Sequence, residues 1–202
     1  MKRKKIPEGL GLKKNWIYES IVTTYSGGRA NSAPMGVYTI DFEGVNLEVY
    51  KTSKTCRNIL ENKEFVINFT DDISLFHSSV FEKEIGYVRA RKVDAPILKN
   101  ADAFLEMRVG EVKDLGDKVG INAEVVDYYL NEERGGEKIN PVNRADALAL
   151  ECLIKATKIP HASVDERNHL KKEIRYISRV VGKVAPGSEA ELLVERIRSL
   201  TR

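Results

Sequence analysis

The sequence predicts a mainly β fold, either an antiparallel barrel or a sandwich, followed by a small helical C-terminal region. Short segments rich in β-branched and aromatic residues recur as far as Leu130 and are separated by turn residues. Most of them are joined by hairpin-type turns, which argues against a βαβ fold. After Asn140 the apolar residues instead recur at the spacing of amphipathic helices. We therefore expect a β domain over residues 1–138 and a helical extension over residues 139–202.

The first two predicted strands flank a glycine turn. Residues 15–24 mix aromatic, β-branched and polar side chains in a strand-like way. The run Ser26-Gly27-Gly28-Arg29 is typical of a tight turn, because glycine accepts a positive φ without steric cost. A second strand is expected over residues 30–42. Pro34 lies inside it and has no N–H to donate, which predicts a bulge or a sheet edge where a ligand can approach the backbone.

The next elements mix strands with short helices. Glu43-Gly44 is expected to turn the chain into the third strand. We expect strands over 46–50, 64–69 and 87–93, helices over 55–62 and 73–81, and a hairpin of strands 103–113 and 118–130 around Leu115-Gly116-Asp117. Ser53 or Thr55 is the expected N-cap of the first helix, because a hydroxyl oxygen can accept from a free helical amide.

The C-terminal region predicts three helices. Asn140 is the expected cap of the first, and Pro141 suits its first position. Capping boxes at residues 163–166 and 188–191 predict the starts of the other two. Residues 131–138 are typical of a linker or loop. The apolar stripe of the first helix consists of Val142, Ala145, Leu148, Ala149, Cys152, Leu153 and Ala156. We expect it to bury against the barrel of its own chain or of a second subunit.

Composition limits the classes of function that we expect for this protein. Much of the formal charge of +3 comes from the first five residues, and a solvated tail explains them better than a nucleic-acid arm. We expect neither a signal peptide nor a membrane span, because no apolar run approaches the roughly 18 residues needed to cross a bilayer. Cys56 and Cys152 are far apart, which indicates free thiols in a reducing, cytoplasmic compartment. The histidines lack metal-ligand spacing, so no metal site is expected.

Two features in chain order indicate a ligand site. The run Asn31-Ser32-Ala33-Pro34-Met35 is small, polar and interrupted by proline, so it exposes backbone groups that suit a flat heteroaromatic ring. The run Lys51-Thr52-Ser53, with Thr55, brings hydroxyl and ammonium groups to a helix N-terminus, a combination that binds a phosphate dianion. Arg57 and Asn58 can add donors. The alternative is that the hydroxyls are ordinary caps and that Pro34 serves the fold alone.

With these motifs the chain resembles the flavin-reductase-like FMN-binding split barrels, and in particular an archaeal family of uncharacterised proteins within them. The matching segments are residues 19–24, 31–36, 50–55 with Arg57-Asn58, 65–68, 143–147 and 154–158. The resemblance implies a Greek-key split β-barrel, bound FMN, and a homodimer with FMN near the subunit interface.

The same resemblance implies roles for individual residues. Thr52, Ser53 and Thr55 match the phosphate-binding segment, and residues 31–35 match the stretch that lines the isoalloxazine ring. Thr23 and Thr24 would contact the ring from the neighbouring strand. Flavin reductases of this kind commonly carry paired prolines after the second strand, where this chain has residues 41–45. That departure leaves the nicotinamide-side pocket open to question.

Three functions follow from these observations. The first is an FMN-dependent oxidoreductase with a small-molecule substrate or a nicotinamide donor; no catalytic residue is assigned, because the flavin carries the redox chemistry. The alternative is a non-catalytic flavin binder, a sensor or carrier. An adaptor for nucleic acid or protein is disfavoured, because glutamates balance the basic residues of the tail. A Rossmann site is excluded, because Gly9-Leu10-Gly11 follows no strand.

Overall fold

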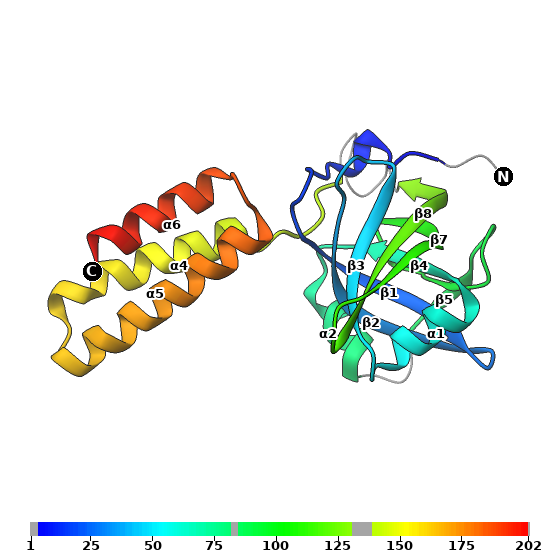
Figure 1. Cartoon of the computed structure of the whole chain (residues 1–202). Helices are drawn as coiled ribbons and strands as arrows, with labels where there is room; N and C mark the ends of the chain where they lie inside the picture. The colour runs from blue at the N-terminus through cyan, green and yellow to red at the C-terminus, as the bar shows by residue number, and fades with distance from the viewer. Residues whose placement is uncertain (1–3, 82–84, 131–138, 202) are drawn as a thin grey trace. The chain divides into compact units, whose positions relative to one another are not determined.

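The computed structural model describes residues 4–81, 85–130 and 139–201, and its elements are drawn in Figure 1. The chain divides into two compact units. The barrel unit contains Met1–Lys14 and Tyr18–Val142, and the helical unit contains Asn15–Ile17 and Asn143–Arg202. The N-terminal segment therefore contributes three residues, between Lys14 and Tyr18, to the helical unit.

The barrel unit is a closed antiparallel barrel. Its strands are β1 (Tyr18–Ser26), β2 (Arg29–Tyr38), β3 (Gly44–Tyr50), β4 (Glu64–Phe69), β7 (Ala103–Asp114) and β8 (Lys118–Leu130). They follow the order β1-β2-β3-β8-β7-β4, and β4 pairs back with β1. Since β3 pairs with β8 rather than with β4, the connection is a Greek key. The predicted mainly β fold with a helical C-terminal region is confirmed.

The turn between β1 and β2 is a two-residue hairpin loop. Ser26 and Arg29 form the last pair of the ladder. Gly27 and Gly28 between them have φ values of 54° and 78°. Two consecutive positive φ angles are what a type I′ turn requires, and its twist matches that of the flanking strands. The predicted glycine turn is thus confirmed, and it sets the register of β2.

The barrel is split between β2 and β3. These strands pair only at Val37 with Leu47 and at Tyr38 with Asn46. Among the described residues, the remainder of β2 has β1 as its only strand partner, and the end of β3 has only β8. We call the free side of Arg29–Gly36, facing away from β1, the β2 edge. Pro34 lies on this edge, which confirms its expected edge position.

The interior is built from alternate residues of the strands. Those of β3, β4 and β8 that are essentially buried include Val45, Leu47, Val49, Phe65, Ile67, Phe69, Val119, Ile121, Ala123 and Val125. This period of two is the pattern of a sheet with one face in the core. Helix α1 (Lys54–Asn62) packs at the end of β1 to β4, and α2 (Ile73–Phe81) packs on β2.

A small hairpin covers the opposite face of β1 and β4. It consists of β5 (Tyr87–Arg89) and β6 (Pro96–Leu98). Val66, Val126 and Phe104 pack against the buried residues of this hairpin and its loop. The predicted strand 87–93 ends early, because Ala90 donates to Ala95 and closes a loop. The strand β6 was not predicted.

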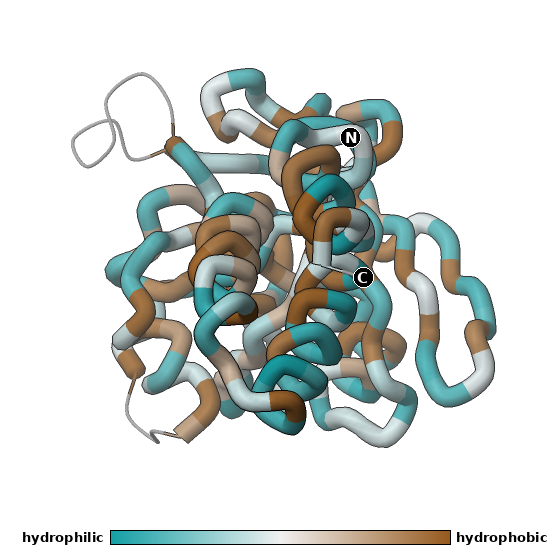
Figure 2. The backbone as a smooth tube through the Cα atoms, turned by 90° about the vertical axis from the view of Figure 1, so that its left-hand side faces the viewer, coloured by the Kyte–Doolittle hydropathy of each residue, from teal (hydrophilic) through white to brown (hydrophobic). Residues whose placement is uncertain are grey.

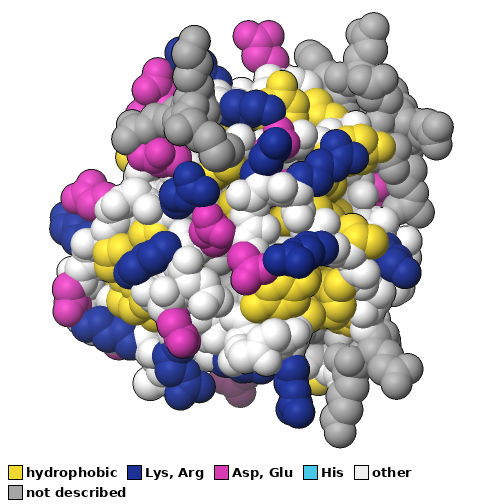
Figure 3. Space-filling view, turned by 90° about the vertical axis from the view of Figure 1, so that its right-hand side faces the viewer, with side chains coloured by type: hydrophobic (Ala, Val, Ile, Leu, Met, Phe, Trp, Pro, Cys, Tyr) yellow, Lys and Arg dark blue, Asp and Glu magenta, His cyan; other side chains and the backbone are white. Residues whose placement is uncertain are grey.

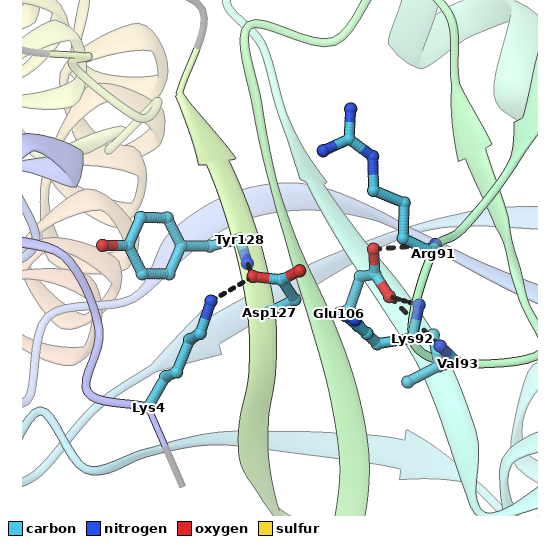
Figure 4. Close-up of polar contacts among 7 residues, drawn as sticks. All are labelled: Lys4, Arg91, Lys92, Val93, Glu106, Asp127 and Tyr128. Atoms are coloured by element: carbon cyan, nitrogen blue, oxygen red, sulfur yellow. Dashed lines mark hydrogen bonds and ion pairs between the residues drawn. The ribbon is translucent and has the colours of Figure 1, made fainter. Parts of the chain in front are cut away.

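A buried carboxylate holds that loop in place. Glu106, on β7, has no exposed surface and accepts from the backbone amides of Arg91, Lys92 and Val93 at 3.0, 2.6 and 3.1 Å (Figure 4). Beside it, the Lys4 ammonium donates to Asp127 of β8, and this pairing lowers the pKa of Asp127 against the effect of burial. The three backbone amides thus satisfy the Glu106 carboxylate. Burial of that carboxylate without hydrogen bonds would be costly.

The helical unit has its own core. Its elements are α4 (Ala145–Lys158), η2 (Ile159–His161), α5 (Val164–Val184) and α6 (Glu189–Leu200). Hydrophobic and hydrophilic stretches alternate along each helix in Figure 2. The core consists of Ala145, Cys152, Ile174, Ile177, Val181, Val184, Ala185, Ala190 and Val194. The expectation that the stripe of the first helix buries against a barrel was wrong, because Leu148, Ala149 and Cys152 pack against α5 and α6.

Two predicted starts shift for a common reason. The strand predicted from residue 15 begins at Tyr18, because Trp16 and Ile17 pack on the helical core. The helix predicted from Asn140 begins at Ala145, because the residues before it bind other parts of the chain. The Val142 carbonyl accepts from the Glu19 amide, and the Asn143 side chain binds the backbone of Ile17 and Val184. Both segments make non-local backbone contacts that a local pattern does not reveal.

Other boundaries follow the predictions more closely. The strand 64–69 and the helix 73–81 are confirmed at both ends. The second strand ends at Tyr38 rather than at residue 42, because Thr39 and Phe42 form a turn in which Phe42 has a φ of 67°. Ser163 and Ser188 cap α5 and α6 as predicted. The predicted linker 131–138 lies outside the described residues.

Candidate functional site

The β2 edge and the start of α1 are the two parts of the candidate site. Helix α1 contacts β1, β2, β3 and β4. It follows directly on Tyr50, the last residue of β3, with Lys51, Thr52 and Ser53 between them. The unpaired part of β2, the free end of β3 and this helix N-terminus therefore belong to one region of the barrel unit. The structure brings together the two features that the sequence placed about a dozen residues apart.

A buried polar cluster joins them. The Asn31 amide donates to Thr55 Oγ1 at 3.0 Å and to Thr24 Oγ1 at 3.4 Å. The Asn58 amide donates to the same Thr24 oxygen at 2.9 Å. Thr24, Thr55 and Asn58 are buried. These four predicted site residues, from β1, β2 and α1, therefore fix the helix against the β2 edge by hydrogen bonds.

The N-terminus of α1 carries several hydrogen-bond donors. Ser53 is its N-cap, since its Oγ accepts from Cys56 N at 3.0 Å. Among the described contacts the Ser53 hydroxyl hydrogen has no acceptor, and neither do the amides of Lys54 and Thr55, which by helix geometry have no intrahelical acceptor. Thr52 is exposed beside them. Hydroxyl and amide donors at the positive end of a helix dipole are the chemistry that a phosphate needs.

The charges around this helix start are mainly basic. Lys54 and Arg57 are exposed. The Lys51 ammonium is bound to both Asp114 oxygens at 2.7 Å. This hydrogen bond, with a smaller contribution from the Gly116 amide, lowers the pKa of Asp114. Lys51 is therefore already paired, while Lys54 and Arg57 form no ion pair with another described residue and can attract a dianion to the N-terminus of α1.

Residues 32–35 of β2 are half-buried except for Pro34. Ser32 Oγ donates to the Ser79 carbonyl of α2 at 3.1 Å and accepts from the Tyr87 hydroxyl at 3.2 Å. Pro34 is exposed, whereas Ala33 and Met35 are half-buried. Ser32 therefore ties the strand to α2 and β5, and the small neighbouring side chains leave the β2 edge accessible.

Thr23 does not join the buried polar cluster. Its hydroxyl donates to the carbonyls of Pro96 and Val66 and accepts from Asn68 Nδ2 at 3.0 Å. Asn68 also accepts from Leu98 N at 3.0 Å. Thr23 is therefore fully buried where the β5–β6 hairpin packs on the barrel. Contact of Thr23 with a ring therefore stays a prediction.

Some residues near the site were not predicted from the sequence. Ser79 and Tyr87 hold Ser32, and Asn62 donates to the Tyr25 carbonyl at 2.8 Å. Asn62 is the last residue of α1. A polar residue at the end of a helix that faces a hairpin was the sequence feature from which this contact could have been predicted. Ser79 and Tyr87 are far from Ser32 in the chain, and no local pattern predicts their contact.

Lys and Arg side chains are interspersed with Asp and Glu on the face in Figure 3. Among the described residues, no helix is long and apolar enough to cross a membrane. Within the same residues, no group of His, Cys, Asp or Glu side chains is arranged to hold a metal ion.

Two family models match the chain, one for each unit. The model described as "Protein of unknown function (DUF447) N-terminal domain" matches residues 18–132. The model described as "Protein of unknown function (DUF447)" matches residues 143–199. An uncharacterized protein from Methanocaldococcus jannaschii is 28% identical over 197 residues, which covers 91% of this chain and 98% of that protein.

Solved structures share the fold. An FMN-bound protein from Methanosarcina mazei, assigned to the same family model, matches with a TM-score of 0.55 and 23% identity, covering 96% of this chain and 99% of that one. Component B of nitrilotriacetate monooxygenase from Bacillus cereus matches with a TM-score of 0.53 and 16% identity, covering 65% and 77%. The first likeness spans both units, and the second covers a smaller share of the chain.

Proposed function

This chain belongs to the DUF447 family, and from that premise we propose that it binds FMN and uses it in a redox reaction. The observation that carries the proposal is the buried polar cluster of Thr24, Asn31, Thr55 and Asn58, which fixes a helix N-terminus beside an unpaired strand edge. The Methanosarcina mazei relative, which is FMN-bound, supports it.

The phosphate of FMN is proposed to bind at the start of α1. Thr52, Ser53 and Thr55 supply hydroxyls, the first turn supplies amides, and Arg57 supplies a cation, while Lys51 and Asn58 add donors from the positions where they already bind Asp114 and Thr24. The residues fit the group, because a dianion needs several directed donors and a positive helix end.

The isoalloxazine ring is proposed to lie along residues 31–35, with Thr23 and Thr24 on the neighbouring strand. A strand edge without a partner offers free backbone donors and acceptors, and the ring has hydrogen-bonding atoms along one edge. Small side chains at Ser32 and Ala33 allow a close approach. A bound flavin would supply hydride or electron transfer, and this chain's residues would position it and limit its exposure to water.

Comparison of FMN with riboflavin tests the phosphate site. Thr52→Ala and Arg57→Gln remove donors that have no structural partner among the described contacts. We expect each to weaken FMN binding about tenfold to a hundredfold, the cost of a charge-assisted hydrogen bond, and to leave riboflavin binding unchanged. Glu61→Gln, at the other end of α1, is the control. Equal losses for both flavins would move the phosphate elsewhere.

A larger side chain at Ala33 tests the ring position. Ala33→Leu should exclude the flavin while the circular dichroism spectrum stays native, because the strand edge can accept the side chain but the ring can no longer approach. Full flavin occupancy in a folded Ala33→Leu protein would rule out this position.

The visible spectrum tests redox function. Bound oxidised flavin should give a band at about 450 nm, set by the flavin chromophore. Bleaching on addition of NADH or NADPH without oxygen would support an oxidoreductase with a nicotinamide donor. A stable flavin band that no reductant of this class bleaches would instead favour the non-catalytic flavin binder. Purified protein that shows no flavin band after incubation with FMN would remove the proposal.

A homodimer with FMN near the interface completes the proposal. Helix α2 packs on β2 beside the candidate site and leaves Ile73, Val80 and Phe81 exposed at 78, 53 and 73%. An uncharged helix with exposed apolar side chains is typical of a protein interface. Sedimentation velocity should give a dimer, and Phe81→Glu should shift it to monomer. A wild-type monomer with FMN bound would contradict this part alone.

A further inference from the structure

The helical unit contains a crevice lined by basic side chains. It lies between α5 and α6 and has a volume of about 220 Å³. Its lining residues are Lys171, Ile174, Arg175, Arg198 and Thr201. Lys171 and Arg175 are one helical turn apart, so they lie on the same face of α5. Arg198 and Thr201 come from the end of α6. Three cationic groups from two helices thus surround one small space.

Two of these three cations, Lys171 and Arg175, lack a partner carboxylate among the described residues. Among the described residues, neither Lys171 nor Arg175 forms an ion pair, although other charged residues of the same helices do. Glu173 of α5 is instead bound to Lys155 of α4, 3.2 Å away. Repulsion between neighbouring cations is normally relieved by an interspersed carboxylate. None of the described residues that line the crevice carries a carboxylate.

Arg198 has unsatisfied hydrogen-bonding capacity. Its Nη2 is held by Glu195 Oε2 at 2.6 Å, and Glu195 in turn accepts from the Ser178 hydroxyl. The Nε of Arg198 is buried and has no acceptor among the described residues. A buried donor without an acceptor is destabilising. A small rotation of the guanidinium toward an oxyanion in the crevice would relieve it.

From these observations we propose that the crevice binds a phosphate-type oxyanion, as the free ion or as the phosphoryl group of a small metabolite. Guanidinium and ammonium groups are the usual partners of such anions, and arginine matches the tetrahedral oxygens with paired N–H donors. Ile174 forms the apolar wall. This site is separate from the proposed FMN site, which belongs to the barrel unit.

Phosphate titration followed by NMR tests the proposal. Full-length ¹⁵N-labelled protein, saturated with FMN so that the flavin site is filled, is titrated with inorganic phosphate at constant ionic strength held with chloride. We expect saturable shifts of the amides around residues 171–175 and 198–201 and of the Arg198 Nε–H signal. Glycerol 3-phosphate in a second titration separates a metabolite from the free ion, since a metabolite site should bind the ester at least as tightly.

A matched pair of double variants gives the decisive comparison. Lys171→Gln with Arg175→Gln should weaken phosphate binding about tenfold or more, whereas Lys172→Gln with Arg196→Gln, which removes equal charge outside the crevice, should change it less than about twofold. Equal effects of the two pairs would overturn the site. So would the same shifts with chloride alone, or an absence of shifts. Because the NMR signals belong to the helical unit, the result does not depend on whether FMN binds.

Discussion

At the residue scale, the candidate site depends on four polar side chains, three of them buried, that satisfy one another. Thr24, Asn31, Thr55 and Asn58 exchange hydrogen bonds across three elements. A buried donor or acceptor that loses its partner is more costly than an exposed one, because water cannot replace the bond. These residues therefore connect the stability of the barrel to the geometry of the site.

Thr55 gives the first prediction. Thr55→Ala removes the nearer of the two acceptors of the Asn31 amide, so we expect a loss of about 1–3 kcal/mol in the free energy of unfolding. Thr55→Ser keeps the oxygen and should lose much less. Thr52→Ala changes an exposed hydroxyl of the same segment and should stay within about 0.5 kcal/mol of wild type. Urea denaturation measures all three. A Thr55→Ala protein as stable as Thr52→Ala would show that the cluster contributes nothing.

The thiols give a second prediction. Cys56 and Cys152 are 1 and 0% exposed. Burial raises the pKa of both, although Lys51 partly opposes this at Cys56. Because the thiolate is the reactive form, a thiol reagent should modify neither cysteine in the native protein near neutral pH, and both after unfolding in urea.

The pH dependence of stability follows from the same shifts. The folded chain favours the neutral thiols, so their contribution is fully present below the ordinary thiol pKa of about 8.5 and is lost as the pH rises through the raised folded pKa. Stability should therefore fall on the alkaline side.

Rapid native-state labelling of either cysteine at neutral pH would contradict the buried positions.

At the element scale, non-local polar contacts decide where several elements end. The residues after β5 turn away from the sheet because Glu106 binds the amides of Arg91, Lys92 and Val93. Thr23 and Asn68 hold β6 in the same way. The β5–β6 hairpin, too short to be stable by itself, is thus attached to the barrel by buried side chains.

Glu106 gives the third prediction. Glu106→Ala leaves three amides without their acceptor and should cost about 3 kcal/mol or more, and Glu106→Gln, which keeps one oxygen, should cost less. Glu111→Gln, on the exposed end of the same strand, should stay within about 0.5 kcal/mol of wild type. Hydrogen exchange should accelerate selectively at residues 91–93. If exchange there is unchanged in Glu106→Ala, the carboxylate does not hold the loop.

The same contrast explains what the sequence could predict. The strand 64–69 and the helix 73–81 follow from local periodicity and were predicted at both ends. Ser53 as the cap of α1 follows from local chemistry. The ion pair of Lys51 with Asp114, the burial of Thr23 under β6, and the start of α4 depend on partners far away in the chain. A single sequence does not reveal such partners, so these positions could not be predicted.

At the scale of the whole molecule, the helical unit is assembled from two distant segments of the chain. Trp16 and Ile17 pack against its core, and the Trp16 indole donates to the Pro186 carbonyl at 3.2 Å. Ile17 N donates to Val184 O at 2.8 Å. The helices are therefore not a simple C-terminal appendage, because their core includes side chains that precede the first barrel strand.

Asn143 gives the last prediction, since it joins those two segments. Its amide donates to the carbonyls of Ile17 and Val184 at 2.8 and 2.9 Å, and its Oδ1 accepts from Ala145 N at 2.9 Å at the start of α4. Asn143→Ala should destabilise the helical unit by about 1–3 kcal/mol, because the Ile17 carbonyl and the Ala145 amide lose their partner and the Val184 carbonyl keeps only the Ile17 amide. Asn140→Ala, an exposed amide three residues earlier, is the matched control.

Hydrogen exchange read separately for the two units distinguishes the outcomes. If Asn143 ties the two segments of the helical unit together, exchange in Asn143→Ala should accelerate in α4, α5 and α6 and stay at the wild-type rate in β3, β4 and β7. Local opening is expected to follow the cooperative unit that loses the contact. Equal acceleration in the barrel strands would mean that the two units unfold as one, and unchanged exchange in the helices would mean that Asn143 is dispensable to the helical core.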